Sequence, residues 1–313
     1  MHFSLIKNLK YSAALFCTQK KILFGPVLEK WKEKFKKSNI GTFDFDMRCL
    51  MAHILQEDFK SVKPESLPNL QLTEDQMKTL ERLFECRLAR VPIQYILGEW
   101  DFYGLNLKMQ PTVFIPRPET ERLVELIIED ANKEVDIKFL EVGCGTGAIS
   151  LSILNNIPKA TGIAIDRSRM ACTLTTENSI ALNLHDKIKV YHHIVSPESY
   201  LPKAIINEKF DYIVSNPPYI KTCDVALLQQ ETKLYENLNS LDGGSDGLKI
   251  VKYIMEIASN QLKSKGKLWL EIDPTHPLVI KTIVNAIYPN NLEYVASHRD
   301  IFQRERFVEI LKC

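Results

Sequence analysis

A short apolar segment followed by closely spaced glycines constrains the fold of this chain more than any other feature. Residues 138–142 (KFLEV) have the composition of a buried strand and lead directly into residues 143–148 (GCGTGA) and the start of an apolar helix. Glycines there allow unusual φ angles and let the backbone approach a ligand, while the helix offers its first N–H groups. The pattern predicts a nucleotide-binding strand, loop and helix; a tight turn that binds nothing is the alternative.

An acidic residue follows the next predicted strand. Residues 161–165 (TGIAI) are largely apolar and lead into Asp166. At that distance from the glycine loop, a carboxylate is placed to accept both ribose hydroxyls of a bound nucleoside; the alternative role for Asp166 is a helix N-cap. Because Gly143, Gly145 and Ala148 also satisfy the dinucleotide-binding pattern, the loop alone leaves the cofactor open.

The turn after a later predicted strand, residues 212–215 (YIVS), indicates a specific chemistry. Asn216 and Pro217 each offer a carbonyl oxygen, and together these can accept both N–H bonds of an NH2 group. An amide-like nitrogen is a poor nucleophile, so positioning replaces a strong base. Prolines 217 and 218 stiffen the turn, and the Tyr219 ring can stack on a planar substrate and face a cationic donor. The alternative is a rigid loop with a capping Asn.

Together the glycine loop and the NPPY turn favour a methyltransferase that uses S-adenosylmethionine, because no hydride-transfer constellation accompanies them. The residues predicted to bind this cofactor are Gly143, Cys144, Gly145, Thr146, Gly147 and Asp166. The residues predicted to bind the substrate are Asn216, Pro217, Pro218 and Tyr219, of which Asn216, Pro217 and Tyr219 are predicted to be catalytic. No metal site is predicted, since His192 and His193 have no third ligand at a useful spacing.

Several further motifs support a family resemblance. Besides the glycine loop and the NPPY turn, they are residues 114–121 (FIPRPETE), 241–248 (LDGGSDGL), 94–98 (QYILG) and 102–104 (FYG). With these motifs the chain resembles the HemK/PrmC family, the protein-glutamine N5-methyltransferases that modify the Gly-Gly-Gln motif of peptide chain release factors. The match extends over most of the chain.

This resemblance implies a fold and a set of roles. The fold is α/β, a class I S-adenosylmethionine-dependent methyltransferase with a Rossmann-like seven-stranded sheet, a small N-terminal helical domain and a β-hairpin linker. Asn216, Pro217 and Tyr219 would receive the glutamine amide, with Asn216 touching both ligands. The glycines and Asp166 would hold S-adenosylmethionine. One departure is that residues 190–196 (VYHHIVS) lack the acid that often binds adenine, which leaves the backbone near Val195 or Glu198 as candidates.

Periodicity and composition suggest four segments. Residues 1–27 contain lysines, no acidic residue and interleaved apolar residues, as in a mitochondrial presequence, although arginine is absent. Apolar residues recur at helical spacing in residues 28–98, where Thr73 and Gln76 have capping-box spacing. The resemblance implies that this helical domain recognises the substrate. Residues 99–116 alternate as a β-hairpin linker, and residues 117–313 form the methyltransferase domain, which closes with an antiparallel hairpin. We expect a mitochondrial matrix protein, with the cytoplasm as the alternative.

Composition narrows the partners. The formal net charge is +1, whereas a nucleic-acid-binding protein usually shows a basic excess. The seven scattered cysteines contain no C-x-x-C pair, which argues against a disulfide framework. The resemblance implies a release factor as the partner, and we expect a monomer that binds neither a membrane nor, stably, nucleic acid. Two alternative functions stay open: an adenine-N6 methyltransferase on DNA or RNA, and a non-enzymatic binding module.

Two segments remain ambiguous between site and scaffold. Arg117 and Glu119 lie between or beside prolines and either face the active site or form a salt-bridged linker. Residues 242–247, a glycine-rich acidic loop, are either a wall of the substrate cleft or a plain connection.

Overall fold

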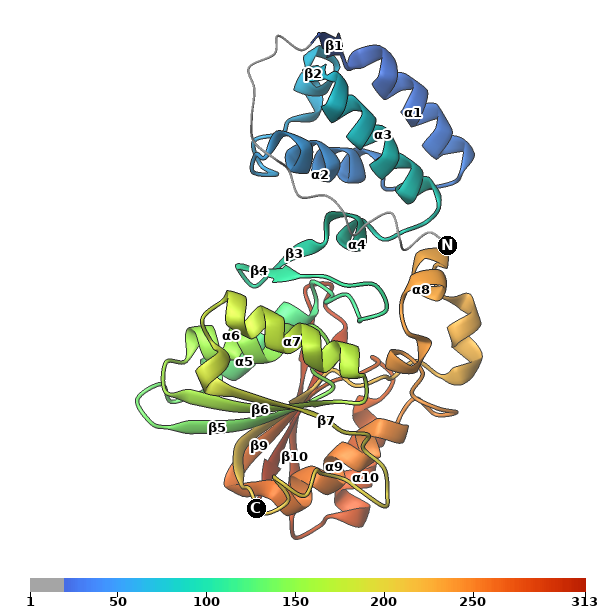
Figure 1. Ribbon diagram of the computed structural model, residues 1–313. Helices are drawn as coiled ribbons and strands as arrows, with labels where there is room; N and C mark the ends of the chain where they lie inside the picture. The colour runs from blue at the N-terminus through green and yellow to red at the C-terminus, as the bar shows by residue number, and fades with distance from the viewer. Residues whose placement is uncertain (1–19) are drawn as a thin grey trace. The chain divides into compact units, whose positions relative to one another are not determined.

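The computed structural model describes residues 20–313, and the chain divides into two compact units, Met1–Gly98 and Glu99–Cys313 (Figure 1). Within the described part of the chain, no helix has both the length and the apolar content needed to cross a membrane. Most of the predicted presequence, residues 1–19, lies outside the described residues.

The described part of the first unit is built mainly of helices. Its elements are β1 (Lys21–Leu23), α1 (Gly25–Lys37), α2 (Phe43–Leu55), the 3₁₀ helix η2 (Pro64–Asn69), β2 (Gln71–Thr73), α3 (Glu74–Leu88) and α4 (Ile93–Leu97). The predicted capping box is present: the Thr73 hydroxyl accepts from the Gln76 N–H, and the Gln76 side chain accepts from the Thr73 N–H. Trp31 and Phe84 pack in the core with ring centroids 4.6 Å apart.

The start of this unit differs from the predicted boundary at residues 27 and 28. Helix α1 begins at Gly25 because Pro26 suits the first turn of a helix, where no N–H bond is lost. Strand β1 precedes it and pairs antiparallel with β2, and Phe24 is fully buried. Residues 21–27, which were expected to belong to the presequence, therefore pack within the first unit.

The second unit begins with a hairpin and continues with alternating helices and strands. Its elements are β3 (Glu99–Phe102), β4 (Leu105–Lys108), α5 (Thr120–Asp130), β5 (Ile137–Val142), α6 (Ala148–Asn156), β6 (Ala160–Asp166), α7 (Arg169–Ala181), η3 (His185–Lys187), β7 (Ile188–His192), β8 (Phe210–Ser215), η4 (Thr222–Leu227), α8 (Gln230–Tyr235), η5 (Leu238–Ser240), α9 (Lys249–Gln261), β9 (Leu262–Glu271), α10 (Pro277–Ile287), β10 (Leu292–Arg299) and β11 (Glu305–Lys312). Gly104, at the turn between β3 and β4, has φ of 74°.

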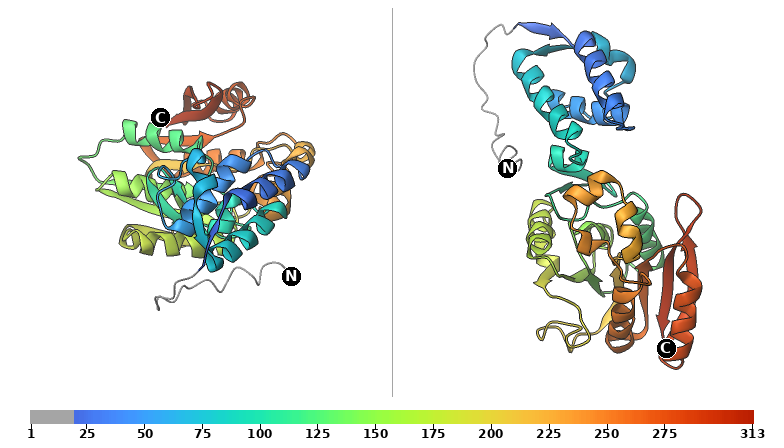
Figure 2. Two further views of the ribbon diagram at one scale, coloured as in Figure 1. Left: turned by 90° about the horizontal axis from the view of Figure 1, so that it is seen from above. Right: turned by 90° about the vertical axis from the view of Figure 1, so that its right-hand side faces the viewer.

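Seven strands form the central sheet of this unit, in the order β10-β11-β9-β8-β5-β6-β7. Strands β7, β6, β5, β8 and β9 run parallel, and β11 pairs antiparallel with both β9 and β10. Figure 1 shows α5, α6 and α7 on one face and α9 and α10 on the other. The C-terminal strands form one edge of the sheet (Figure 2). The predicted class I fold with a closing antiparallel hairpin is confirmed.

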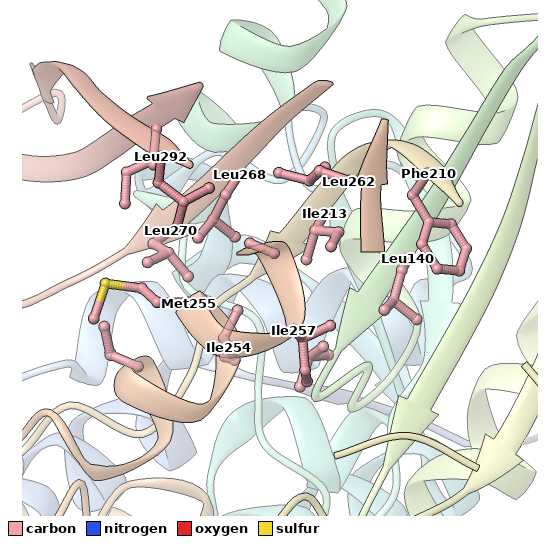
Figure 3. Packing of buried hydrophobic residues seen from close by; sticks show 14 of the residues in the cluster. Leu140, Phe210, Ile213, Ile254, Met255, Ile257, Leu262, Leu268, Leu270 and Leu292 are labelled. Atoms are coloured by element: carbon pink, nitrogen blue, oxygen red, sulfur yellow. The ribbon is translucent and has the colours of Figure 1, made fainter. Parts of the chain in front are cut away.

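The main core lies between the sheet and the helices α9 and α10 (Figure 3). Leu140, Ile213 and Leu268 come from three neighbouring parallel strands, and Ile254 and Ile257 come from α9. Helices cover both faces of the parallel strands, which explains why these strands are apolar runs and not alternating ones.

The topology brings the carboxyl ends of the parallel strands to one edge. From β5 the chain moves through β6 to β7 in one direction, and β8 then pairs on the opposite side of β5. Ligands of open α/β sheets bind at such a switch point. The glycine loop, Asp166, the NPPY turn and Glu271 all lie at the ends of these strands.

Candidate functional site

A cavity of about 300 Å³ opens at the switch point between β5 and β8. It is lined by the predicted residues Gly143, Cys144, Gly145, Thr146, Asp166, Asn216, Pro217, Pro218 and Tyr219. Of the residues predicted for the site, Gly147 is the one that does not line it. The volume is in the range of small-molecule sites, so the fold brings predicted cofactor and substrate residues to a single cavity.

The loop between β5 and α6 requires glycine at three positions. Gly143, Gly145 and Gly147 have φ of 82°, 56° and 84°, in the left-handed region that other residues rarely adopt. A Cβ on Gly143 or Gly145 would meet nothing within 4 Å, whereas one on Gly147 would lie 2.9 Å from Thr175 Cγ2. Gly143 and Gly145 thus expose bare backbone toward open space, and Gly147 allows the loop to pack against α7.

The Cys144 thiol belongs to the packing of this loop. Its sulfur is buried and accepts a hydrogen bond from Thr175 Oγ1 at 3.3 Å. A hydrogen bond with Cys172 and burial raise the pKa of Cys144 well above its ordinary value. The thiol therefore stays protonated, which argues against a nucleophilic role.

Asp166, at the end of β6, is tied to the glycine loop. Its Oδ2 accepts the N–H of Gly145 at 3.0 Å, and its Oδ1 accepts the N–H of Ser168 at 2.8 Å. Burial raises the pKa of Asp166, while these two hydrogen bonds act in the opposite direction. The N-cap of α7 is Ser168, whose hydroxyl accepts from Ala171. Asp166 is thus fixed at the cavity wall with lone pairs left for ribose hydroxyls, and the N-cap alternative does not hold.

The segment after β7 decides between the two candidates that the sequence offered for binding adenine, the backbone near Val195 and Glu198. His193, Ile194 and Val195 line the cavity after β7. Glu198 is exposed to solvent. Between the two candidates raised by the sequence, the segment around Val195 is therefore the one that borders the cavity, and it offers backbone groups and apolar side chains instead of a carboxylate.

The NPPY turn begins where β8 ends. Ser215 Oγ donates to the carbonyl of Val142 at 2.6 Å and joins the ends of β8 and β5. Asn216 Nδ2 donates to Thr120 Oγ1 at 3.2 Å, and the Tyr219 hydroxyl donates to Glu271 Oε1 at 3.1 Å. The turn is therefore held by side-chain contacts as well as by its prolines.

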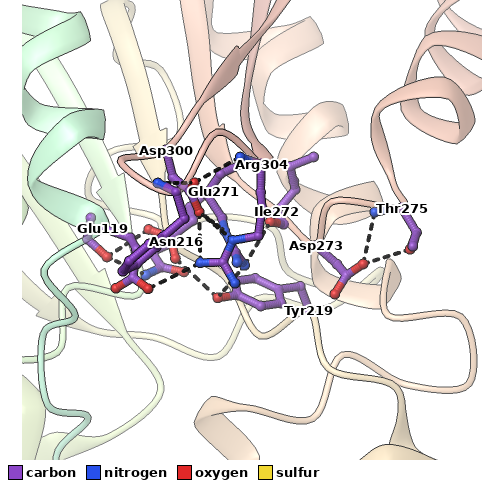
Figure 4. A network of polar contacts seen from close by, with 12 residues as sticks. Glu119, Asn216, Tyr219, Glu271, Ile272, Asp273, Thr275, Asp300 and Arg304 are labelled. Carbon is purple, nitrogen blue, oxygen red and sulfur yellow. Dashed lines mark hydrogen bonds and ion pairs between the residues drawn. The ribbon is translucent and has the colours of Figure 1, made fainter.

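A buried carboxylate, Glu271, supports the turn from behind (Figure 4). It lies at the end of β9, is 1% exposed, and its Oε2 accepts from Thr120 Oγ1 at 2.7 Å. Arg306 Nη1 donates to the Tyr219 hydroxyl at 3.3 Å. Burial raises the pKa of Glu271, and the Thr120 hydrogen bond, the Arg306 charge and the Tyr219 hydrogen bond oppose this shift. Burial and the nearby Glu271 carboxylate raise the pKa of Tyr219, so its hydroxyl remains a donor.

Arg117 serves both of the roles that the sequence left open. Its guanidinium forms an ion pair with Glu236 at 2.6 Å and lies over the Phe114 ring, while the residue also lines the cavity. Glu236 is buried, and its second oxygen accepts the N–H of Ile115 at 3.2 Å. The contact ties the segment after β4 to the segment that follows α8. Glu119 instead pairs with Arg304 at 3.3 Å.

The loop of residues 242–247 packs against the NPPY turn. Gly243 donates its N–H to Ile220, and Ile220 donates to Leu241. A Cβ on Gly243 would lie 2.7 Å from the Pro218 carbonyl oxygen, and one on Gly247 would overlap that of Tyr219. The loop is therefore part of the support of the substrate turn and is more than a plain connection.

Comparison with known proteins assigns the family. Residues 105–236 match the family model of the methyltransferase small domain, and residues 27–98 match the PrmC N-terminal domain. The human MTRF1L release factor glutamine methyltransferase is 39% identical over 295 residues, covering 91% of this chain and 86% of the relative. The release factor glutamine methyltransferase of Thermodesulfovibrio yellowstonii is 34% identical, over 78% of this chain and 86% of the relative. The chain belongs to the release factor glutamine methyltransferase family.

The predicted resemblance is thereby confirmed, and the chain is an S-adenosylmethionine-dependent methyltransferase. The site fits this cofactor on structural grounds of its own. The glycine loop has open space above Gly143 and Gly145, and Asp166 lies at the wall of the same cavity. These residues would hold the nucleoside part of S-adenosylmethionine.

Sequence reasoning did not identify three residues that line the cavity or contact the residues that line it: Thr120, Glu236 and Glu271. Thr120 is part of the motif at residues 114–121, but nothing in the motif indicates what its hydroxyl contacts. Glu271 had a weak signal, since an acid directly follows the apolar residues of a predicted closing strand. Glu236 precedes η5 in a segment without a motif, and its burial becomes visible only in the structure.

Proposed function

We propose that this protein transfers a methyl group from S-adenosylmethionine to the side-chain amide nitrogen N5 of the glutamine in the Gly-Gly-Gln motif of a peptide chain release factor. One observation carries the proposal. In a member of this family, the NPPY turn and the glycine loop line the same cavity, at the carboxyl ends of adjacent strands. A methyl donor on the loop side would then face a nitrogen held on the turn side.

The turn supplies acceptors for an NH2 group. The amide nitrogen of glutamine is a poor nucleophile because its lone pair is delocalised into the carbonyl. The Asn216 side-chain oxygen and the Pro217 carbonyl would accept its two N–H bonds and hold the nitrogen for in-line attack. When bound, S-adenosylmethionine supplies the methyl group. As the N–C bond forms, the bond between the methyl carbon and sulfur breaks, and the neutral thioether S-adenosylhomocysteine is the leaving group. One of the held N–H protons is released to solvent, and the two carbonyl acceptors stabilise the positive charge that develops on the nitrogen before it leaves.

The experiment is methyl transfer from labelled S-adenosylmethionine to a purified release factor. The matched control is the same factor with the glutamine of its Gly-Gly-Gln motif changed to alanine. Label confined to the intact factor supports the proposal. Labelling of both factors, or of nucleic acid in their place, would contradict it, and the second result would favour the adenine-N6 alternative.

Asn216→Ala tests the role of the turn. We expect the variant to fold and to bind S-adenosylmethionine, but to lose a factor of about 10²–10³ in kcat, by analogy with the removal of one preorganised hydrogen-bonding group from an active site. Turnover is followed with the labelled methyl donor, and cofactor binding by calorimetry. Wild-type turnover in this variant would remove the NPPY turn from the mechanism.

The site of action proposed for this activity is the mitochondrial matrix. Support comes from the sequence of residues 1–27, which contain lysines and no acidic residue. A fluorescent fusion of the full chain should localise to mitochondria, whereas a fusion that lacks residues 1–19 should remain in the cytoplasm. Equal distribution of the two fusions would contradict the proposal.

A further inference from the structure

A chain of hydrogen bonds leads from the NPPY turn into the protein interior. Asn216 Nδ2 donates to Thr120 Oγ1 at 3.2 Å, and Thr120 Oγ1 donates to Glu271 Oε2 at 2.7 Å. Figure 4 shows Asn216 and Glu271 next to each other, with Tyr219 below them. Thr120 is 3% exposed and Glu271 is 1% exposed, so bulk water does not replace these contacts.

The direction of these hydrogen bonds follows from the number of protons. A threonine hydroxyl has one proton, and Glu271 accepts a hydrogen bond at each of its two oxygens, which is the pattern of an ionised carboxylate. These two hydrogen bonds and the Arg306 charge favour that form against the burial that raises the pKa of Glu271. Oε2 of Glu271 receives the Thr120 hydroxyl, and Oε1 receives the Tyr219 hydroxyl. Arg306 donates to the Tyr219 hydroxyl, so that hydroxyl must use its own proton on Glu271. If Thr120 gives its proton to Glu271, it can only accept from Asn216.

This arrangement selects one of the two orientations of the Asn216 carboxamide. The NH2 group must face Thr120, because the reversed carboxamide would place Oδ1 against an oxygen whose proton is used elsewhere. With Nδ2 bound to Thr120, Oδ1 is the atom that remains for a ligand in the cavity that Asn216 lines. An oxygen acceptor suits a substrate NH2 group and repels a substrate carboxylate.

We propose that Thr120 and Glu271 are positioning residues that hold Asn216 with its side-chain oxygen turned toward the substrate nitrogen. They act through Asn216. Thr120 itself also lines the cavity, so the test must separate its effect on Asn216 from a direct contact with a ligand. The inference rests on the proposed function, because it concerns the same nitrogen. It also explains how the site distinguishes the amide of glutamine from the carboxylate of glutamate, which has no N–H to donate.

A double-mutant cycle tests whether Thr120 acts through Asn216. Thr120→Val removes the hydroxyl and keeps the shape of the side chain, and Thr120→Ser keeps the hydroxyl. We expect Thr120→Val to lower kcat roughly 10- to 100-fold, below the effect of removing Asn216 itself, with the Kd of S-adenosylmethionine changed less than about threefold. Thr120→Ser should retain most of the kcat. In an Asn216→Ala background, Thr120→Val should have almost no further effect on kcat.

The matched control is Ser259→Ala in α9. Ser259 Oγ also accepts a hydrogen bond from an asparagine Nδ2, that of Asn291, but it does not line the cavity. Its effect on kcat should be small and the same with and without Asn216. If Thr120→Val does not fold, as judged by circular dichroism, Thr120→Ala replaces it in the same cycle.

Three results would overturn the inference. One is an equal loss of kcat on Thr120→Val in both backgrounds. The others are a loss of S-adenosylmethionine affinity as large as the loss of kcat, and a Thr120→Ser variant as inactive as Thr120→Val. Wild-type protein is assayed first on the intact factor and on its Gly-Gly-Glu variant. No wild-type label on the glutamine overturns the proposed function and this inference together, whereas an additive cycle in an active enzyme overturns this inference alone.

Discussion

A comparison of Gly247→Ala with Gly244→Ala should separate two effects: the loss of support for the NPPY turn, and the backbone strain of an alanine at a positive φ angle. Gly247 has φ of 74°, and a Cβ there would overlap the Tyr219 carbonyl oxygen and lie 2.8 Å from His276 Cε1. Gly244, in the same loop, has φ of 89°, but its Cβ would meet Lys249 Cβ at 3.2 Å and no backbone atom of the NPPY turn. The two residues share the backbone strain and differ in what an added methyl group would displace.

The expected magnitudes follow from these contacts. An alanine in the left-handed region costs about 1–2 kcal/mol, and Gly244→Ala should lose about that free energy of unfolding. Gly247→Ala should lose a further 1–3 kcal/mol, roughly the cost of overpacking, which corresponds to about 2–12 °C in Tm. Because Tyr219 carries the displaced carbonyl, the turn must move, and a shift of about 1 Å at a site can cost about 10²-fold in rate.

Both variants are measured by thermal unfolding and by methyl transfer to the intact release factor, at a temperature where each remains folded. The expected result is a kcat for Gly244→Ala within about threefold of wild type and a kcat for Gly247→Ala about 10²-fold lower. Equal values of kcat in the two folded variants would refute the argument that the loop of residues 242–247 supports the turn.

Two further predictions concern buried carboxylates. Burial raises the pKa of Glu141 from 4.5 to about 8, so the folded protein keeps this carboxyl protonated up to about pH 8, whereas the unfolded chain releases the proton above about pH 4.5. The free energy of unfolding should therefore fall as pH rises from 4.5 to 8, by at most about 5 kcal/mol. Glu141→Gln should remove this loss, so the Tm difference between variant and wild type, measured from pH 5 to 8, should increasingly favour the variant; a constant difference would contradict the reasoning. Arg117→Met leaves Glu236 buried without its cation, which costs about 1–3 kcal/mol. The backbone amides of α8 should then exchange hydrogen about 10- to 100-fold faster than in the wild type. Arg122→Met is the control because the ion pairs of Arg122 are exposed, and equal exchange rates in the two variants would contradict the role of Arg117.

The parts of the site that the sequence predicted share one property. The glycine loop, Asp166 and the NPPY turn each lie directly after an apolar strand, and each is recognised from neighbouring residues alone. The capping box of Thr73 and Gln76 was predictable for the same reason. Parallel strands place their carboxyl ends at one edge, so three local motifs were sufficient to predict one cavity.

The parts that the sequence did not predict depend on partners that are remote along the chain. Arg117 and Glu236 are separated by 119 residues, and the sequence offered no reason to pair them over other charges. Strand β1 was not predicted, because it depends on its pairing with β2, about 50 residues further on. Local periodicity contains no information about such pairs.

The Thr120–Glu271 contact shows what information would have been needed. The two residues are 151 positions apart, and the arrangement of the sheet brings each of them to the NPPY turn in a different way. Glu271 reaches the turn because β9 pairs with β8 in parallel, so that the end of β9 lies beside the residue that precedes Asn216. Thr120 reaches it because α5 contacts β9 as well as α6. Strand order is a property of the whole sheet and cannot be read from a single motif. An acid that ends a strand therefore predicts a functional role only once the neighbouring strand is known, and here that neighbour carries the NPPY turn that lines the cavity.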